Sequence, residues 1–167
     1  KNEVSNFSDF AVLYRTNAQS FALEKALISR DIPYKIIGGI RFYDRKEIKD
    51  VLAILRLVLN PRDRVSFERV TKNVISGIGL ASLEKIYLAL GLDDSLVELD
   101  TEHVLSGKAK NSFLRLQNFL KTIDRTANPS EIITEVINYF DFANLVDDGT
   151  PATTERQENL DALVGNT

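Results

Sequence analysis

Basic and aromatic side chains are interleaved in the segment from Gly38 to Asp50, GGIRFYDRKEIKD. Its cations are Arg41, Arg45, Lys46 and Lys49, and its aromatic residues are Phe42 and Tyr43. Cations neutralise phosphates and aromatic rings stack on bases, so this composition is typical of single-strand nucleic-acid binding. The alternative is structural, because the rings can pack at a junction and the cations can pair with Glu47 and Asp50 one helical turn away. We expect both roles: the aromatic rings mainly pack inside the protein, and one or two of the cations contact nucleic acid.

A second polar run, from Tyr14 to Ser20, follows the short apolar stretch 10–14. That stretch is typical of a strand buried on both faces, and a helix is predicted to begin directly after it. Open α/β folds bind ligands at this edge of the sheet, and the amides of a helix start attract phosphate. Arg15 would add charge, and Asn17 and Gln19 would add amide donors. Plain helix capping with a solvated Arg15 is the alternative, and the spacing alone favours it.

A glycine turn, Ser76-Gly77-Ile78-Gly79, precedes another predicted helix. Glycines allow a backbone amide to approach a phosphate closely, and the helix start adds its dipole. Lys72 and Lys85 flank the turn. The turn could be the hairpin of a helix-hairpin-helix duplex binder, although an ordinary connection between helices explains it as well.

Several classes of site are absent from the sequence. It contains no GxxxxGK[ST] phosphate loop and no cysteine, and its one histidine is His103. We therefore expect no catalytic residues, no metal site and no bound cofactor in this chain, and a solvent-exposed His103. No window of eighteen consecutive apolar residues predicts a membrane span. The lack of cysteine fits a cytoplasmic protein.

The charge is distributed unevenly along the 167 residues, which carry a net charge of −3. Residues 1–72 hold 14 Lys and Arg against 9 Asp and Glu, and residues 73–167 hold 7 against 15. The polar motifs described first lie in the basic part. An acidic chain can therefore still present a local phosphate-facing surface.

The apolar pattern predicts a mainly α chain with a small α/β beginning. A strand at 10–14, a helix that ends before Pro33 and a strand at 34–37 form a βαβ-type unit, which implies a parallel sheet with further strands. The remaining predicted elements are helices at about 44–59, 66–72, 81–91, 108–125, 130–140 and 153–164. The first of them should bury Ile48, Val51, Leu52, Leu55, Val58 and Leu59. The predicted domains are residues 1–43 and 44–167.

Three runs of the chain resemble the UvrD/PcrA/Rep family of superfamily 1 DNA helicases. They are YRTNAQS at 14–20, GGIRFYDRKEIKD at 38–50 and ERQENLDAL at 155–163. The resemblance implies that residues 1–43 are part of a RecA-like motor domain, the 2A domain, and that residues 44–167 are most of its inserted helical accessory domain, 2B. Phe21 departs from the family's usual arginine, and Val74-Ile75-Ser76 departs from its usual Thr-Pro and basic residue.

The resemblance also implies a function, that of an ATP-dependent 3′–5′ DNA helicase in repair or replication. The chain would be a fragment, inactive alone, with ATP and Mg²⁺ bound elsewhere in the longer protein. Its partners would be a single-strand/duplex DNA junction and the remaining motor domains, with no membrane. The single strand would meet Arg15, Asn17, Gln19, Arg41, Arg45 and Lys46, and the duplex would meet Lys72, Ser76, Gly77, Ile78 and Gly79. The alternatives are a recombination helicase–nuclease subunit and a helical protein-docking or autoinhibitory module with little DNA affinity.

Overall fold

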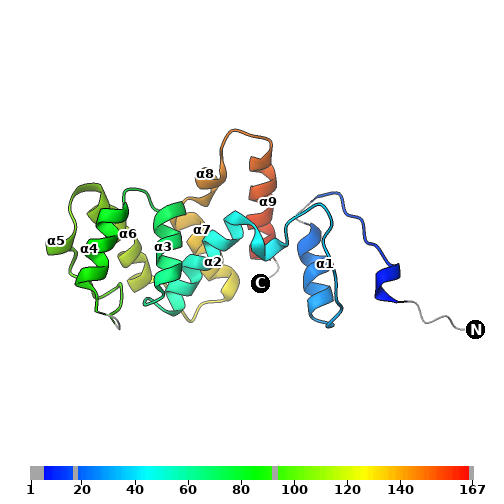
Figure 1. Cartoon of the computed structure of the whole chain (residues 1–167), viewed down its shortest axis with the longest axis horizontal. Helices are drawn as coiled ribbons and strands as arrows, with labels where there is room; N and C mark the ends of the chain where they lie inside the picture. Colours follow the sequence, from blue (N-terminus) through cyan, green and yellow to red (C-terminus); the bar gives the residue numbers. More distant parts are fainter. Residues whose placement is uncertain (1–5, 17–18, 92–93, 166–167) are drawn as a thin grey trace, which may run out of the picture.

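The computed structural model describes residues 6–16, 19–91 and 94–165, and every regular element within these ranges is helical. The mainly α prediction is therefore confirmed (Figure 1). The helices are α1 (Gln19–Ile28), α2 (Lys46–Leu59), α3 (Arg64–Asn73), α4 (Leu80–Ala89), α5 (Thr101–Val104), α6 (Gly107–Thr122), α7 (Pro129–Tyr139), α8 (Phe142–Val146) and α9 (Ala152–Gly165). Single 3-10 turns occupy Phe7–Asp9 and Phe42–Asp44. Among these residues, no helix is long and apolar enough to cross a membrane.

The two predicted strands do not form in the described part of the chain. Residues 10–14 and 34–37 lie outside every helix and make no strand ladder there. Leu13 and Ile37 are 95% and 79% exposed, although both belong to apolar runs. A parallel strand needs the backbone of a neighbouring strand, and none lies beside these two segments among the described residues. The α/β beginning therefore stays a prediction.

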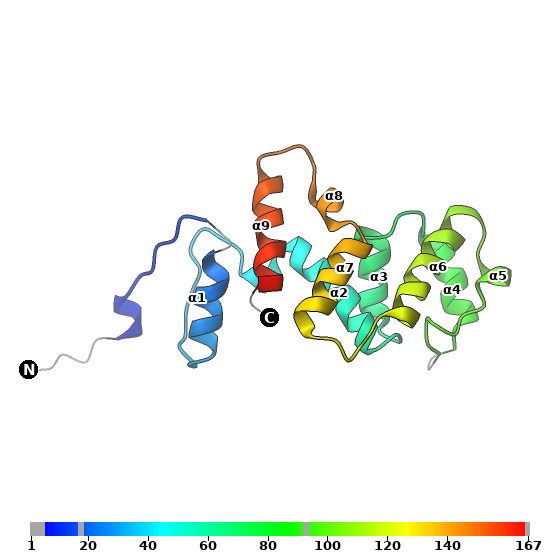
Figure 2. The same ribbon diagram turned by 180° about the vertical axis from the view of Figure 1, so that it is seen from behind.

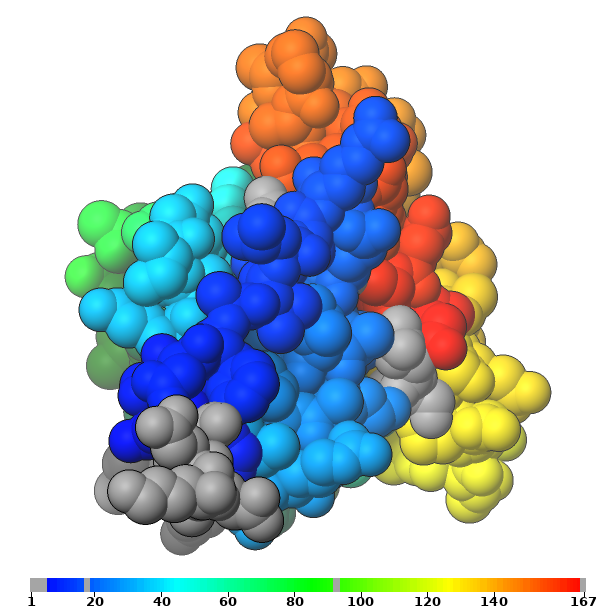
Figure 3. All heavy atoms as spheres, turned by 90° about the vertical axis from the view of Figure 1, so that its right-hand side faces the viewer, coloured from blue at the N-terminus to red at the C-terminus, as the bar shows by residue number. Residues whose placement is uncertain are grey.

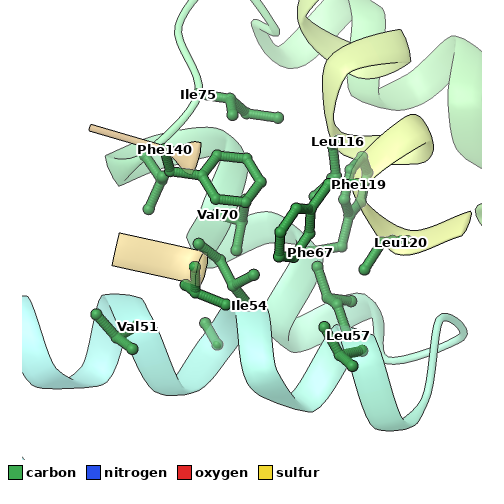
Figure 4. Packing of buried hydrophobic residues seen from close by; sticks show 14 of the residues in the cluster. Val51, Ile54, Leu57, Phe67, Val70, Ile75, Leu116, Phe119, Leu120 and Phe140 are labelled. Atoms are coloured by element: carbon green, nitrogen blue, oxygen red, sulfur yellow. The ribbon is translucent and has the colours of Figure 1, made fainter. Parts of the chain in front are cut away.

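The core is built around α2, which packs against α3, α7 and α9. Figure 4 shows Ile54 and Leu57 of α2 facing side chains of α3 and α6. Ile48, Val51 and Val58 are buried as predicted, while Leu52 and Leu55 are partly buried. The predicted burial of Leu59 is wrong, because this side chain is 82% exposed. The buried face of α2 is instead centred on Ile54 and Leu57. Leu52, Leu55 and Leu59 lie along one edge of this face, where burial is incomplete.

Two helix starts differ in detail from the predicted ones. Asp63 caps α3 by accepting a hydrogen bond from the Ser66 amide (3.0 Å), so the helix begins before its predicted first residue, Ser66. Asn128 caps α7 with Pro129 in the first helical position, so Ser130 lies inside the helix. Asn and Asp are strong caps, and proline fits the first turn because it has no amide hydrogen to leave unpaired.

The molecule is elongated, with its first helix and its glycine turn toward opposite ends. Figures 1 and 2 show α1 and the segment before it at one end, and α4, α5 and α6 at the other. Figure 3 looks onto the first of these ends, which is largely covered by α1 and the segment before it. The last helix, α9, returns to the middle of the molecule beside α2.

Candidate nucleic-acid interface

The turn between α3 and α4 presents backbone on the surface. Ile78 is buried, with 7% of its surface exposed, while Ser76, Gly77 and Gly79 are exposed. Gly77 has a φ of +98°, in the left-handed region that favours glycine. Gly79 is the N-cap of α4 with an ordinary extended backbone and no side-chain cap. The buried isoleucine thus anchors the turn, while its neighbours Ser76, Gly77 and Gly79 lie at the surface.

The turn is held against the start of α6. The hydroxyl of Ser112 donates to the carbonyl oxygen of Ser76 at 2.6 Å. Lys72 lies in the last turn of α3 and its side chain is exposed. Of the predicted duplex residues, Lys72, Ser76, Gly77 and Gly79 thus lie at the surface and Ile78 is buried, and the turn is bonded to α6.

The first predicted single-strand run is partly described. Arg15 is exposed, and Gln19 lies at the first position of α1. The side-chain oxygen of Gln19 accepts from the amides of Arg15 (2.9 Å) and Thr16 (3.3 Å), so this side chain folds back over the preceding turn. Asn17 lies outside the described residues. Phe21, the departure from the family pattern, is buried with its ring centroid 4.0 Å from that of Phe42.

The second predicted run divides into exposed and buried cations. Arg41 and Lys46 are exposed, and Arg41 pairs with Asp44 at 2.9 Å. Lys49 also pairs with Asp44 at 2.8 Å. The hydrogen bond from Lys49, with help from Arg41, lowers the pKa of the Asp44 carboxyl. Asp44 therefore neutralises part of this run and does not cap α2, which begins after Arg45.

Arg45 is the buried cation of this run, with 7% of its surface exposed. Its guanidinium donates to Asn159 Oδ1 (2.6 Å) and to Ser20 Oγ (2.8 Å), and it lies 5.1 Å from the centre of the Phe42 ring. This placement gives Arg45 a structural role between α1, α2 and α9. Its predicted contact with single strand stays untested.

Glu24, a buried carboxylate beside Arg45 where α1 meets the start of α2, was not identified from the sequence. Glu24 is 3% exposed and accepts hydrogen bonds from the Ser20 hydroxyl (3.0 Å), the Phe42 amide (3.2 Å) and the Tyr34 hydroxyl (3.1 Å). The only sequence signal for it was the i,i+4 spacing of Ser20 and Glu24 on one helix.

Asn159 is the other residue whose position the sequence did not reveal. It is 1% exposed, and its amide nitrogen donates to Glu47 Oε1 at 2.6 Å while its oxygen accepts from Arg45. By helical pattern alone the run ERQENLDAL is an ordinary surface helix. This run is one of the three that resemble the helicase family, and that resemblance was the signal that could have identified Asn159 as a structurally important residue. We call Ser20, Glu24, Arg45, Glu47 and Asn159 the junction network.

The acidic residues and the histidine of the described ranges form no metal centre. These ranges contain no group of three or more His, Cys, Asp or Glu placed to hold a metal ion. His103 is exposed as expected, in the short helix α5, and its Nδ1 lies 2.7 Å from Asp100 Oδ2. The hydrogen bond to Asp100 raises the pKa of the His103 imidazole. The described surface carries exposed cations, among them Arg15, Arg41 and Lys46, and an exposed glycine turn.

Comparison with known proteins identifies the family. The profile of the UvrD-like helicase C-terminal domain matches residues 1–143. The chain belongs to this family. It is similar to ATP-dependent DNA helicase PcrA of Bacillus subtilis, with 38% identity over 96% of this chain. The proteins of the same name from Staphylococcus epidermidis and Leuconostoc citreum are 35% and 34% identical over 95% and 96% of the chain.

The match covers only part of these relatives, because the chain spans 23% of the length of each. Membership of the UvrD-like family, expected from three runs of sequence, is confirmed. The finer assignment of residues 44–167 to an inserted accessory domain is not tested by the match, which is to the C-terminal domain as a whole. Neither the nuclease subunit nor the docking module is favoured by these relatives.

Proposed function

We propose that this chain is part of an ATP-dependent 3′–5′ DNA helicase that acts on single-strand/duplex junctions in cytoplasmic DNA repair or replication. Residues 1–43 contribute to a RecA-like motor domain, and residues 44–167 form the helical accessory domain. The observation that carries the proposal is an exposed glycine turn at a helix start, in a chain 38% identical to a DNA helicase over 96% of its residues. ATP and Mg²⁺ bind in other parts of such a protein, because this chain has no phosphate loop.

The segment before α2, together with the first residue of α2, contacts single strand and the rest of the motor. The exposed cations Arg15, Arg41 and Lys46 face the strand, together with Asn17 and Gln19. Exposed apolar side chains alternate with these polar groups, among them Leu13, Ile37 and Ile40, which are 95%, 79% and 64% exposed. Apolar side chains at this density normally lie against another protein surface, and the remaining strands of a motor domain are the partner we propose for them.

The turn at the far end contacts duplex. The backbone amides of Ser76 to Gly79 and the start of α4 meet phosphates, and Lys72 adds a charge. Such contacts fix position without reading sequence, so duplex binding is independent of base sequence and weakens with salt.

The duplex role is tested in the longer helicase by Gly79→Val. A β-carbon at this position meets no other atom within 4 Å, so the fold is preserved while the approach of a phosphate is blocked. The expected loss of junction affinity is about 1–2 kcal/mol, because one or two neutral donors are removed among many phosphate contacts. Fork unwinding should slow, whereas translocation on pure single strand should be unchanged. A parallel loss of both activities, or of neither, would show that the turn only connects two helices.

The single-strand role is tested by Arg15→Ala in the same longer protein. Turnover of ATP stimulated by single strand should fall more than basal turnover, because the exposed arginine acts through DNA. Equal loss of both rates would assign Arg15 to folding of the motor domain instead.

A further inference from the structure

The side chain of Lys108 lies directly over the glycine turn. Lys108 is the second residue of α6, and the Cγ, Cδ and Cε atoms of its side chain lie 2.7, 3.0 and 3.3 Å from the point where a β-carbon on Gly77 would be. The bond from Ser112 to the Ser76 carbonyl holds the same stretch of α6 against the turn. The aliphatic part of the lysine therefore occupies the space that the glycine leaves empty.

Lys108 has no counter-charge in the described part of the chain. Its neighbour Lys110 pairs with Glu102 at 2.6 Å. Arg115, two turns along α6, lies 5.4 Å from the ring centre of Tyr139 and donates to its carbonyl oxygen. Lys108 is exposed and makes no such ion pair or hydrogen bond there. Its ammonium is thus free to meet an anion beside the turn.

We propose that Lys108 is a phosphate-binding residue of the duplex site. This inference rests on the proposed contact between the turn and duplex DNA. The turn itself, Ser76 to Gly79, contains no cation, so its amides alone would attract a phosphate only weakly. A lysine whose stem is packed on the turn brings a full charge to the same phosphate, and less side-chain entropy is lost on binding because the stem is already confined.

Two structural requirements explain a glycine at position 77. Its φ of +98° requires a residue that adopts the left-handed region, and its missing side chain leaves a channel for the lysine stem. An asparagine can adopt this φ but would fill the channel. Glycine is therefore the residue that satisfies both needs.

The test compares Lys108→Met with a matched control on the same helix. Methionine keeps an unbranched stem over Gly77 and removes only the charge. Lys121→Met makes the same change in the last turn of α6, about 20 Å away along the helix axis. Lys108→Arg should restore the charge. Binding of a short blunt DNA duplex and of a single strand of equal length is measured for each variant of the full chain by fluorescence anisotropy, from about 50 to 200 mM salt.

Lys108→Met is expected to weaken duplex binding about three- to fivefold at the lower salt and to make the salt dependence shallower by about one phosphate contact. The control and Lys108→Arg should bind as the original chain does, and all variants should unfold at the same urea concentration. If the original chain binds duplex and Lys108→Met binds equally well, Lys108 is not part of the site, although the proposed duplex role stands. An equal loss for single strand would overturn the assignment to duplex. No duplex binding by the original chain would overturn the proposed duplex contact itself.

Discussion

Gly77 and Gly79 are two residues apart and differ in what they require of the backbone. Gly77 has a positive φ and lies against the Lys108 stem, whereas Gly79 has a φ of −89° with open space where a β-carbon would be. The two glycines of one motif therefore have separable roles. Gly77 is needed for the backbone conformation of the turn. Gly79 is not needed for that conformation, and its missing side chain leaves room for a ligand to approach the backbone.

This difference predicts that alanine lowers the stability of the chain at Gly77 and has little effect on it at Gly79. Gly77→Ala should lower the free energy of unfolding by about 1–2 kcal/mol, because alanine is strained at this φ and displaces Lys108. Gly79→Ala should change it by less than about 0.5 kcal/mol, because no strain is introduced. Urea denaturation of the two variants measures both values. Equal stability of the two would mean that the turn has another backbone conformation in solution.

At the scale of elements, α2 shows how one helix divides its apolar residues between core and surface. Ile54 and Leu57 are fully buried, whereas Leu59, at the end of the same helix, is 82% exposed. Helical spacing places Leu59 on the stripe of Leu52 and Leu55, and that stripe lies at the edge of the buried face.

Alanine substitutions on α2 should reproduce this division. Ile54→Ala removes a buried side chain and should cost about 2–5 kcal/mol of unfolding free energy, the transfer term plus a cavity. Leu59→Ala should cost less than about 0.5 kcal/mol, because the side chain is already in solvent. Thermal or urea unfolding of both variants checks the ranking. A large effect of Leu59→Ala on the isolated chain would show that this leucine is covered in solution.

The loop between α8 and α9 predicts a dependence of stability on pH. Asp148 accepts hydrogen bonds from Thr150 Oγ1 (2.5 Å), the Thr150 amide (3.1 Å) and Arg156 Nη1 (2.6 Å). The bonds from Thr150 and then from Arg156 lower the pKa of the Asp148 carboxyl below its ordinary value. The stability that they contribute is therefore present above the unfolded-state pKa of about 4 and is lost as pH falls through the lower folded-state pKa.

Asp148→Asn should make the free energy of unfolding less sensitive to pH below about pH 4, because the amide no longer titrates. Urea titrations at a series of pH values measure this. Asp161→Asn on α9 is the matched control, since the Asp161 side chain makes no hydrogen bond or ion pair with the described residues. An unchanged acid dependence in Asp148→Asn would mean that the loop is not formed around this carboxylate.

At the scale of the whole molecule, the junction network connects the end that carries α1 to the helical body. Glu24 of α1 accepts from the Phe42 amide, and Arg45 donates both to Ser20 of α1 and to Asn159 of α9. Buried polar groups are costly unless they are satisfied, so these bonds fix one arrangement of segments that are far apart in sequence. Phe21 and Phe42 pack beside them.

Glu24→Ala should loosen α1 without unfolding the helical body. Loss of the carboxylate leaves the buried Phe42 amide without that acceptor, at a cost of about 1–3 kcal/mol. Amide hydrogen exchange in α1 should accelerate about 10- to 100-fold, while exchange in α2, α3 and α7 stays unchanged. Glu84→Ala, on the exposed face of α4, is the control. Faster exchange everywhere would show that the two parts unfold as one unit.

The sequence alone determined the helical character of residues 44–165, the approximate extent of most helices, the exposure of His103 and the family. These features depend on local spacing, on turn residues such as Asn60-Pro61 and Asn128-Pro129, and on short runs that can be recognised in order along the chain. The short helix α8 was missed, because five residues carry too little periodicity.

Tertiary structure alone decided which polar residues are exposed. Arg45 and Arg41 belong to one basic run, yet Arg45 is buried because Asn159, 114 positions away, lies beside it, while Arg41 stays at the surface. Leu59 and Leu57 are both apolar and only one is buried. The side chain of Lys108 packs against Gly77, although its helix begins 30 residues later in the chain. Each of these outcomes depends on which distant segment is adjacent, and local periodicity carries no information about that.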